Sequence, residues 1–511
     1  MLGWLVTVPL TVVRWLLSPI PLTVFVLLMT WIYYFMTKKF DFWKSRGVSG
    51  PKPRFPWGTE FGSPLWVSPI EFEDWVYSQH GRKKFCGYFE FNRPVLFVKD
   101  LELIRHITIK DFEYFTDRRD QGSNETLKDA VSILRGARWK ETRSVMSPSF
   151  STSKLKAMHQ LTLENAKNLT HYVLLDMEKK GEVDMKDMFG RFTMDNIASC
   201  AFGVNCNSFT DPNSTFATNA AKLFNTERAV IMRFLKGLAL PECIMSRLPD
   251  PLVESSQFFA DVVTRTIRSR DNSTHSAPDF LQLLMDTKDK EGNRVLSTSS
   301  IISQSVLFLF VGYDTTASLL TFAGYCLATH PEVQERVQEE VDEAVSRHGD
   351  LTYTALQEMS YLDRVMSETL RLYPPATRLE RESTKEYTLP GTDVRLPIGT
   401  VVQISVLSIH RDPEYYPDPL QFDPDRFLPE AKERRHPCAY LPFGSGPRNC
   451  LAMRFALFEA KVALAELMRQ MTLKPTACTP SPPMPLDKMA FLLTPAGRKM
   501  PLIAVPRSSA E

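Results

Sequence analysis

The sequence predicts one large, mainly helical domain with small β-sheets, preceded by an N-terminal membrane helix. Three observations lead to this prediction. No charged residue occurs from Trp15 to Met36, strand-forming residues gather between 84 and 99, and from about residue 126 onward the apolar pattern is mostly helical. No later stretch has the composition of an interdomain linker, so residues 59–511 are expected to form a single domain.

The composition narrows the class of protein. With 511 residues, 43% of them hydrophobic and 23% charged, the chain is typical of a large globular protein. Its formal net charge of +2 gives no reason to expect nucleic-acid binding. The eight cysteines form no CxxC pair, so neither a zinc knuckle nor a disulfide framework is indicated. Scattered single thiols are typical of a reducing compartment.

The first expected element is a membrane anchor within residues 1–46. Its uncharged run is about long enough to cross a bilayer as a helix, and Pro19 and Pro21 either kink it or mark its start. Lys38 and Lys39 follow the run, which favours a single-pass signal anchor with the body of the chain in the cytosol. A cleaved signal peptide is the alternative, but the apolar run is long and the lysines lie on the wrong side of it.

The next segment, residues 47–58, contains spaced prolines. It predicts a stiff, extended hinge that sets the orientation of the domain against the membrane. Since the domain is expected in the cytosol, its glycosylation sequons are expected to be unmodified. These sequons begin at Asn124, Asn168, Asn213 and Asn272.

Two long helices are expected near the middle of the chain. The stretch from Ser299 to His330 is mostly apolar, and a helix that is hydrophobic all round lies inside a large protein. The stretch from Pro331 to Arg347 starts with proline at a first helical position and carries one charged face. It therefore predicts a solvated amphipathic helix.

The most informative motif runs from Phe443 to Cys450 and reads Phe-Gly-Ser-Gly-Pro-Arg-Asn-Cys, directly before an apolar helical run from Leu451 to Leu467. A cysteine between a Gly-rich turn and a helix start lies where backbone N–H groups and the helix dipole favour a thiolate. The glycines allow close approach to a flat ligand, and Arg448 can reach an anionic group on it. These features suit a thiolate ligand of haem iron. A small buried cysteine beside an ordinary turn is the alternative for this motif alone.

A polar motif interrupts the long apolar helix. Gly312, Asp314 and Thr315 follow Val311 in mid-helix, where a carboxylate and a hydroxyl are costly unless they are paired or used. The glycine weakens the helix and the Thr hydroxyl competes for the carbonyl one turn back, so together they can open a local groove. The motif is consistent with an oxygen-binding groove and proton relay, or with a simple helix kink.

Two further motifs have the spacing of one helix face. Glu368 and Arg371 are three residues apart between apolar neighbours, which predicts a buried structural pair, and Arg426 is a candidate third member. Trp139 and Arg143 place an indole N–H and a guanidinium on one face, which suits one carboxylate. An ordinary surface ion pair and a surface arginine are the alternatives.

Taken together and in this order, the motifs closely resemble those of the cytochrome P450 family of haem-thiolate monooxygenases. The resemblance covers essentially the whole chain, including the anchor and proline hinge of the microsomal class, and implies the cytochrome P450 fold. Longer stretches look like the vertebrate drug-oxidising enzymes of family 3, subfamily A, and their invertebrate relatives. These stretches are Leu379-Glu380-Arg381, His410-Arg411-Asp412-Pro413 and residues 443–456.

The resemblance implies a role for each matching residue. Cys450 would be the proximal ligand of haem b, with Phe443 packed beside the thiolate. The haem propionates would be bound by Arg118, Trp139, Arg143, Arg381 and Arg448. The structural triad behind the cysteine loop would be Glu368, Arg371 and Arg426, and protons would be handled by Asp314 and Thr315. The substrate pocket would be lined by Ser132, Phe310, Val311, Thr315 and Ala376.

The resemblance also implies an activity and partners. One oxygen atom of O2 would enter a lipophilic xenobiotic, steroid or lipid at the endoplasmic reticulum membrane. Electrons would come from NADPH through the flavins of NADPH–cytochrome P450 reductase, with cytochrome b5 as a second donor. Residues that would dock this partner are Arg135, Arg138, Lys140, Lys432, Arg434 and Arg435. The apolar stretch from Ala229 to Met245 falls at the family's variable access helices and would contact the membrane or belong to the core.

Two other functions fit less well. A haem-thiolate isomerase that rearranges a peroxide without a reductase, like thromboxane synthase, tends to lack the acid–Thr pair, and a haem sensor or carrier does not need it. Two residues depart from the family pattern. Ala452 replaces a usual glycine and is expected to press on the haem or shift the following helix. Val311 replaces a usual alanine and is expected to narrow access to the iron.

Overall fold

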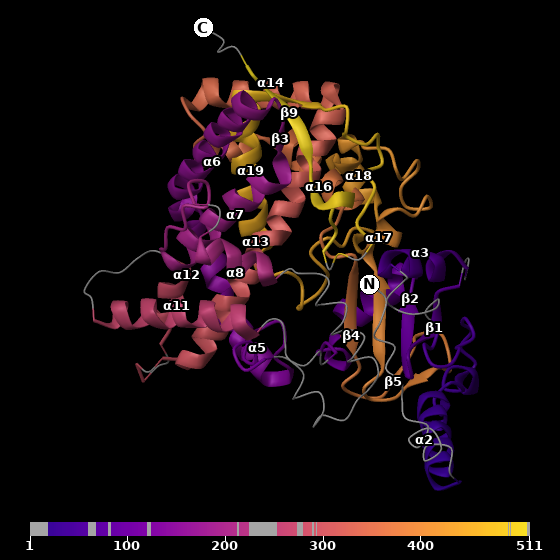
Figure 1. The fold of residues 1–511 in the computed structure, drawn as a ribbon. Coiled ribbons are helices and arrows are strands. Elements are labelled where there is room, and N and C mark those ends of the chain that lie inside the picture. Colours follow the sequence, from indigo (N-terminus) through magenta and orange to yellow (C-terminus); the bar gives the residue numbers. More distant parts are fainter. Residues whose placement is uncertain are drawn as a thin grey trace, which may run out of the picture.

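The computed structural model has a helical part and a smaller β-rich part, with helix α2 projecting beyond the β-rich part (Figure 1). This arrangement confirms the predicted fold class, mainly helical with small sheets. The residues that the structure describes are 19–59, 68–79, 83–119, 124–211, 214–223, 253–272, 279–288, 291–292, 294–488, 490 and 492–507.

Helices occupy most of the described chain. The α-helices are α2 (Pro19–Thr37), α3 (Pro69–Gln79), α4 (Leu101–Arg105), α5 (Gly136–Met146), α6 (Thr152–Lys180), α7 (Met185–Phe202), α8 (Thr215–Leu223), α11 (Val253–Asp271), α12 (Phe280–Asp286), α13 (Thr298–Thr329), α14 (Pro331–His348), α15 (Tyr353–Glu358), α16 (Ser360–Leu372), α17 (Val406–His410), α18 (Pro429–Arg434) and α19 (Met453–Gln470). Short helical turns are η1 (Lys44–Arg46), the π-helical η2 (His106–Lys110), η3 (Phe112–Tyr114), η4 (Ser147–Phe150), η5 (Pro424–Phe427), η6 (Pro437–Ala439) and η7 (Ala496–Arg498).

The strands form small sheets. The largest has the order β1 (Phe85–Glu90), β2 (Arg93–Val98), β7 (Val401–Ser405) and β4 (Arg378–Glu382). Its β2 and β7 run parallel, and its other neighbours are antiparallel. A second sheet has the order β3 (Val183–Asp184), β9 (Pro501–Pro506) and β8 (Met471–Pro475), and β5 (Tyr387–Thr388) pairs with β6 (Arg395–Leu396). The expected strands at 84–99 are thus a hairpin that strands distant in sequence extend.

Helix α13 is the centre of the helical part. Its second half, from Thr316 to Ala328, is buried on every side, as the apolar pattern predicted. It packs against α7, α16 and α19. Helix α14 begins with Pro331 and buries one face while its charged face is exposed, so the predicted amphipathic helix is confirmed.

Two helices in the described part of the chain are long and apolar enough to cross a membrane, α2 and α13. Helix α13 lies mostly inside the domain, whereas α2 is almost fully exposed. The start of the expected anchor, at Trp15, lies outside the described residues. The chain after α2 docks on the large sheet: the Trp43 indole N–H donates to Tyr88 O at 3.0 Å, and a Cβ at Gly87 would lie 2.3 Å from that indole.

Candidate functional site

The segment before α19 forms a tight loop that presents Cys450. Gly444 and Gly446 have φ angles of 74° and 73°, in the left-handed region that favours glycine. A Cβ at Gly446 would lie 1.7 Å from Thr108 O, so no other residue fits there. The Cys450 N–H donates to Phe443 O at 2.8 Å and closes the loop. Helix α19 begins at Met453, two residues later than the sequence predicted.

The surroundings of the Cys450 thiol act in opposite directions on its charge. Burial raises the pKa of Cys450, whereas a hydrogen bond from the Ala452 N–H and the Arg143 and Arg118 guanidinium groups lower it. The sequence predicted donors that favour a thiolate, and they are present. The effect of burial is larger than the effect of these donors, so the pKa of Cys450 is raised.

Guanidinium groups from separate parts of the chain gather around this loop. Arg118 donates to Arg448 O at 3.3 Å, and Arg381 on β4 donates to Ser445 O at 3.3 Å. Arg143 on α5 donates to Asn449 O at 2.9 Å and to its side-chain oxygen at 2.6 Å. The loop before Cys450 is therefore covered by cations.

Arg448 is the most tightly held of these arginines. It donates to Thr116 O and to Leu134 O, both at 2.7 Å. Its guanidinium lies over the buried Trp139 ring, 4.2 Å from the ring centroid, a favourable cation–π geometry. Asp117 is 3.6 Å away, at ion-pair distance. Trp139 thus supports Arg448, in addition to sharing a helix face with Arg143.

The cluster carries an excess of buried positive charge. Burial, together with the neighbouring Arg118 and Arg448, lowers the pKa of Arg381 to about 9. Burial and Arg118 likewise lower the pKa of Arg448 to about 9. Arg381 Nε has no hydrogen-bond partner among the described residues. Since isolated buried charges are costly, such a cluster suits an anionic ligand with more than one acid group.

The motif in mid-α13 lies where this helix is partly uncovered. Val311 is 41% exposed and residues 312–315 are half-buried, whereas burial resumes at Thr316. The Thr315 hydroxyl donates to Val311 O at 2.6 Å, as expected for a Thr bonding one turn back. A Cβ at Gly312 would lie 2.7 Å from Ile197 on α7, so close helix packing requires the glycine. The uncovered stretch is therefore built into the packing of α13 on α7.

Asp314 points to a different neighbour. Its carboxylate lies 3.7 Å from Lys186 Nζ at the start of α7. Burial raises the pKa of Asp314, and the Lys186 ammonium opposes this effect. The acid and the hydroxyl of this motif are thus adjacent in sequence but are held by different partners, one ionic and one within the helix.

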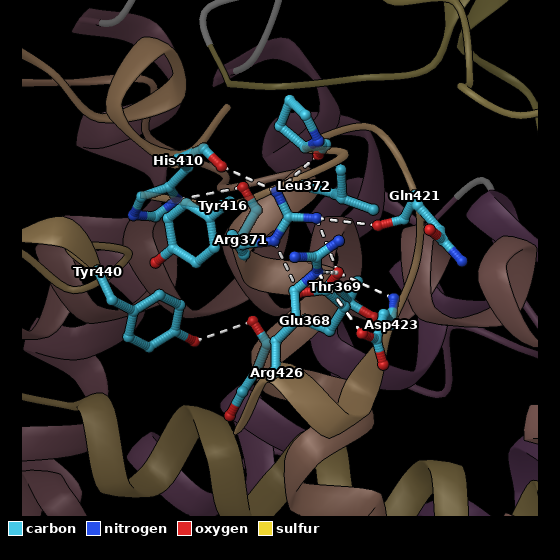
Figure 2. Close-up of polar contacts among 12 residues, drawn as sticks. Glu368, Thr369, Arg371, Leu372, His410, Tyr416, Gln421, Asp423, Arg426 and Tyr440 are labelled. Atoms are coloured by element: carbon cyan, nitrogen blue, oxygen red, sulfur yellow. Dashed lines mark hydrogen bonds and ion pairs between the residues drawn. The ribbon is translucent and has the colours of Figure 1, made fainter. Parts of the chain in front are cut away.

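Glu368 and Arg371 on α16 form a fully buried pair. Arg371 donates to both carboxylate oxygens of Glu368, each at 2.7 Å, and neither side chain is exposed. Figure 2 shows how the other donors of Arg371 reach backbone carbonyls. These carbonyls belong to His410, Pro419 and Gln421.

Arg426 lies beside this pair without entering the same hydrogen-bond set. Its Nε is 3.5 Å from Glu368 Oε1, and it donates to Asp418 O at 3.1 Å. The Asp423 N–H donates to the same Glu368 oxygen at 3.0 Å. The structure therefore brings the three predicted residues together, with Arg426 as an ion-pair neighbour.

The predicted pocket residues come from three segments. Phe310 is half-buried and Val311 is exposed on α13, Ser132 is half-buried between α4 and α5, and Ala376 is exposed just before β4. The stretch from Ala229 to Met245 lies outside the described residues.

The basic residues that were predicted to dock a partner differ in their surroundings. Arg135 pairs with Glu382 at 2.9 Å, and Arg138 with Asp129 at 2.7 Å. Arg435 donates to Arg426 O and lies over aromatic rings, so it serves the fold. The exposed members of the set are Arg135, Arg138, Lys140, Lys432 and Arg434.

Comparison with known families decides the assignment. The family model described as Cytochrome P450 matches residues 53–502. The chain belongs to the cytochrome P450 family. Cytochrome P450 3A11 of Mus musculus is 38% identical over 487 residues, which cover 91% of this chain and 94% of that protein. Cytochrome P450 9e2 of Blattella germanica is 38% identical and covers 90% and 93%, and Cytochrome P450 6B2 of Helicoverpa armigera is 34% identical and covers 93% and 96%.

As a member of this family, the P450 is a haem-thiolate monooxygenase, an oxidoreductase whose haem iron is held by a cysteine thiolate. The residues present fit that group. A half-buried cysteine follows a glycine loop, and in the adjacent cluster the pKa of Arg381 is lowered and its Nε has no hydrogen-bond partner among the described residues, a setting that haem propionates would suit.

Sequence reasoning missed several residues of this site. Asn449 holds Arg143, and Lys186 pairs with Asp314. His410 accepts from the Leu441 N–H at 2.8 Å and bonds Arg371 O through its other nitrogen, so it joins the buried pair to the cysteine loop. Only its place in the His-Arg-Asp-Pro stretch marked it. Glu459 on α19 accepts from Asn196, and burial raises its pKa to about 8.

Proposed function

We propose that this P450 binds haem b through Cys450 and oxidises a lipophilic xenobiotic, steroid or lipid with electrons from NADPH. The observation that supports this most directly is the buried excess of guanidinium groups around the Cys450 loop. In the pair at Glu368 and Arg371 the two charges neutralise each other, so the pair does not require a ligand. The arginine cluster at the Cys450 loop has an excess of positive charge, and the haem propionates would neutralise it.

The chain's own residues would hold the haem through its iron and through its propionates. Cys450 would supply the thiolate, with Phe443 beside it, and the propionates would be bound by Arg118, Trp139, Arg143, Arg381 and Arg448. Glu368, Arg371 and Arg426 would support the loop from behind. When bound, the haem supplies the activation of dioxygen, which places one oxygen atom in the substrate and the other in water.

The uncovered stretch of α13 would serve the reaction through proton handling. The Thr315 hydroxyl donates to Val311 O, so the lone pairs of Thr315 Oγ1 stay available to accept a hydrogen bond from a group in the groove. Asp314 is half-buried beside Lys186, and burial raises its pKa above that of an ordinary aspartate, a direction that suits a proton donor. The two residues would deliver protons to oxygen and release water. The pocket lining would be Ser132, Phe310, Val311, Thr315 and Ala376.

Residues 1–46 would anchor the protein once in the endoplasmic reticulum membrane, residues 47–58 would be the hinge, and residues 59–511 the cytosolic catalytic domain. The exposed helix α2 supports the anchor. The electron donors would be NADPH–cytochrome P450 reductase and cytochrome b5. The exposed basic residues near α5 and those near α18 are candidates for contact with an acidic partner.

The reduced, carbon-monoxide difference spectrum of the wild type beside Cys450→Ser tests this proposal. The wild type should give the red-shifted Soret band of thiolate-bound haem, and the variant should lose it. A stable wild-type haem protein without that band would exclude Cys450 as the ligand. Turnover that needs NADPH and reductase separates the monooxygenase from an isomerase, which would convert a peroxide without either.

A further inference from the structure

The chain between residues 124 and 136 links α13 to the Cys450 loop, and it contains no regular helix or strand. Buried side chains from those two places hold it. Gln304 of α13 binds its middle, at Asp129 and Val131, and Arg448 of the loop binds it near its end, at Leu134. The position of the residues between them therefore depends on both.

Gln304 binds this segment through both groups of its amide. Its Oε1 accepts from the Val131 N–H at 2.8 Å, and its Nε2 donates to Asp129 O. Gln304 is fully buried, and Val131 and Asp129 are nearly so. The amide thus pairs with backbone groups two residues apart, as a neighbouring strand would. Without it, a buried N–H and a buried C=O would lose their partners.

Other contacts hold the rest of the segment. The Asp129 carboxylate accepts from Ser299 at 2.8 Å and from Arg138 at 2.7 Å. Ala130 O accepts from the Ile133 and Leu134 N–H groups, each at 2.9 Å, so Ser132 and Ile133 follow the turn that begins beside the Gln304 contact. Ser303 Oγ donates to Thr126 O at 2.5 Å, upstream of the Gln304 contact. Downstream, Leu134 O accepts from Arg448 at 2.7 Å. The residues between Val131 and Leu134 are Ser132 and Ile133, both half-buried.

The position of Gln304 on α13 relates it to the uncovered groove. Gln304 and Val311 are seven residues apart, which places them on one helix face about 10 Å apart along the axis. Gln304 is covered by the segment, whereas Val311 is exposed. On this face of α13, the cover therefore ends between Gln304, which the segment covers, and Val311.

We propose that Gln304 is a positioning residue that holds Ser132 and Ile133 as one wall of the substrate pocket. The inference rests on the proposed function, because the groove beside Val311 is a substrate pocket only if haem binds at Cys450. Gln304 does not touch the reacting atoms. It sets how much room the pocket has at this wall.

Two variants separate the donor and acceptor of the amide. Gln304→Met keeps the length and removes both hydrogen bonds, and Gln304→Glu keeps the acceptor for Val131 N–H while losing the donor to Asp129 O. The matched control, Ser303→Ala, removes the neighbouring bond to Thr126 O from the same helix. If Gln304→Met fails to fold, Gln304→Glu still tests the proposal.

Two measurements on the purified holoenzyme report separately on the stability of the segment and on the room in the pocket. Hydrogen exchange of the peptide containing Val131 should rise about tenfold in the Gln304 variants and stay near wild type in Ser303→Ala. Spectral titration should give an unchanged dissociation constant for imidazole, which needs little room. The constant for a bulky triaryl imidazole should change about tenfold, because this ligand must reach the pocket walls.

Each outcome decides between roles. Faster exchange with an altered ratio of the two dissociation constants supports the proposal. An unchanged ratio despite faster exchange makes Gln304 merely structural, and unchanged exchange means that Gln304 does not hold the segment. A wild type without the thiolate carbon-monoxide band would contradict the proposed function, whereas the exchange result would still report on the contact itself.

Discussion

Two buried arginine sites in this molecule differ in how completely their hydrogen-bond donors are used. We call the Glu368–Arg371 pair the closed site and the cluster around Arg381 the open site. Arg371 donates through all three of its nitrogens, to Glu368 and to backbone carbonyls of three other residues. Arg381 donates only to the carbonyls of Glu380 and Ser445, and its Nε has no hydrogen-bond partner in the described part of the chain.

This difference in hydrogen bonding distinguishes a site that stabilises the fold from a site that binds a ligand. A buried cation with a buried anion needs nothing more, and removing one partner leaves an uncompensated charge. Arg381 is close to that condition, because burial and its cationic neighbours lower its pKa to about 9, and Arg448 beside it has a pKa lowered to about 9 even with Asp117 at 3.6 Å. An anion from outside the chain relieves it.

The largest effect should come from breaking the closed site. Arg371→Leu leaves the Glu368 carboxylate buried without its cation, which should cost about 3–5 kcal/mol of unfolding free energy. Thermal melting or denaturant unfolding of the purified protein measures it. The matched control is Arg347→Leu, which breaks an exposed pair with Glu358 and should cost less than about 1 kcal/mol. Equal losses in the two variants would contradict the assignment of Arg371.

Breaking the open site should give the reverse pattern. Arg381→Leu removes one buried, poorly partnered cation, so the haem-free protein should keep its stability or gain some. Haem affinity should fall about tenfold or more, because a charge-assisted bond to a propionate is lost. Haem titration of the apoprotein and its melting temperature measure the two effects. Unchanged haem affinity would show that Arg381 is not a propionate ligand.

The sequence reveals local parts of both sites and misses their long-range assembly. Glu368 and Arg371 are one helix turn apart, so their spacing alone predicts the contact. The anion site depends on Arg118, Arg381 and Arg448, which lie far apart in the chain and converge only through the sheet and the loop. Periodicity carries no information on that convergence, and only the family resemblance indicated it.

Buried polar connectors are the least predictable class. His410 and Gln304 are ordinary polar residues in apolar runs, and their function depends on which backbone groups the fold brings to them. The fold class was more accessible, because the apolar α13 and the amphipathic α14 carry their patterns in continuous sequence. The pairing of β2 with β7 could not be predicted from the sequence, because the two strands are about three hundred residues apart.

A smaller effect is expected where the closed site meets the cysteine loop. Burial, together with the Arg371 charge, lowers the pKa of His410 to about 3. Between pH 6.5 and 3 the unfolded state therefore binds a proton that the folded state does not, so stability falls as the pH falls. Lowering the pH from 6.5 to 5 should cost about 1–2 kcal/mol through this group.

The variant His410→Gln tests that dependence, because glutamine can still accept from the Leu441 N–H and cannot titrate. Its melting temperature should fall less than that of the wild type between pH 6.5 and pH 5. Parallel pH profiles for the two proteins would mean that His410 does not contribute to the acid sensitivity.

The smallest effect should come from a change beside the open site that alters no charge. Ala452 has φ of −91° and ψ of 15°, a conformation open to any residue, so its backbone does not require the glycine usual in the family. Ala452→Gly should therefore leave haem affinity within about twofold and stability within about 0.5 kcal/mol. Gly446→Ala is the contrast, because its Cβ would lie 1.7 Å from Thr108 O. A large gain in haem affinity for Ala452→Gly would mean that the Ala452 methyl presses on the haem, and that shape as well as charge limits binding at this site.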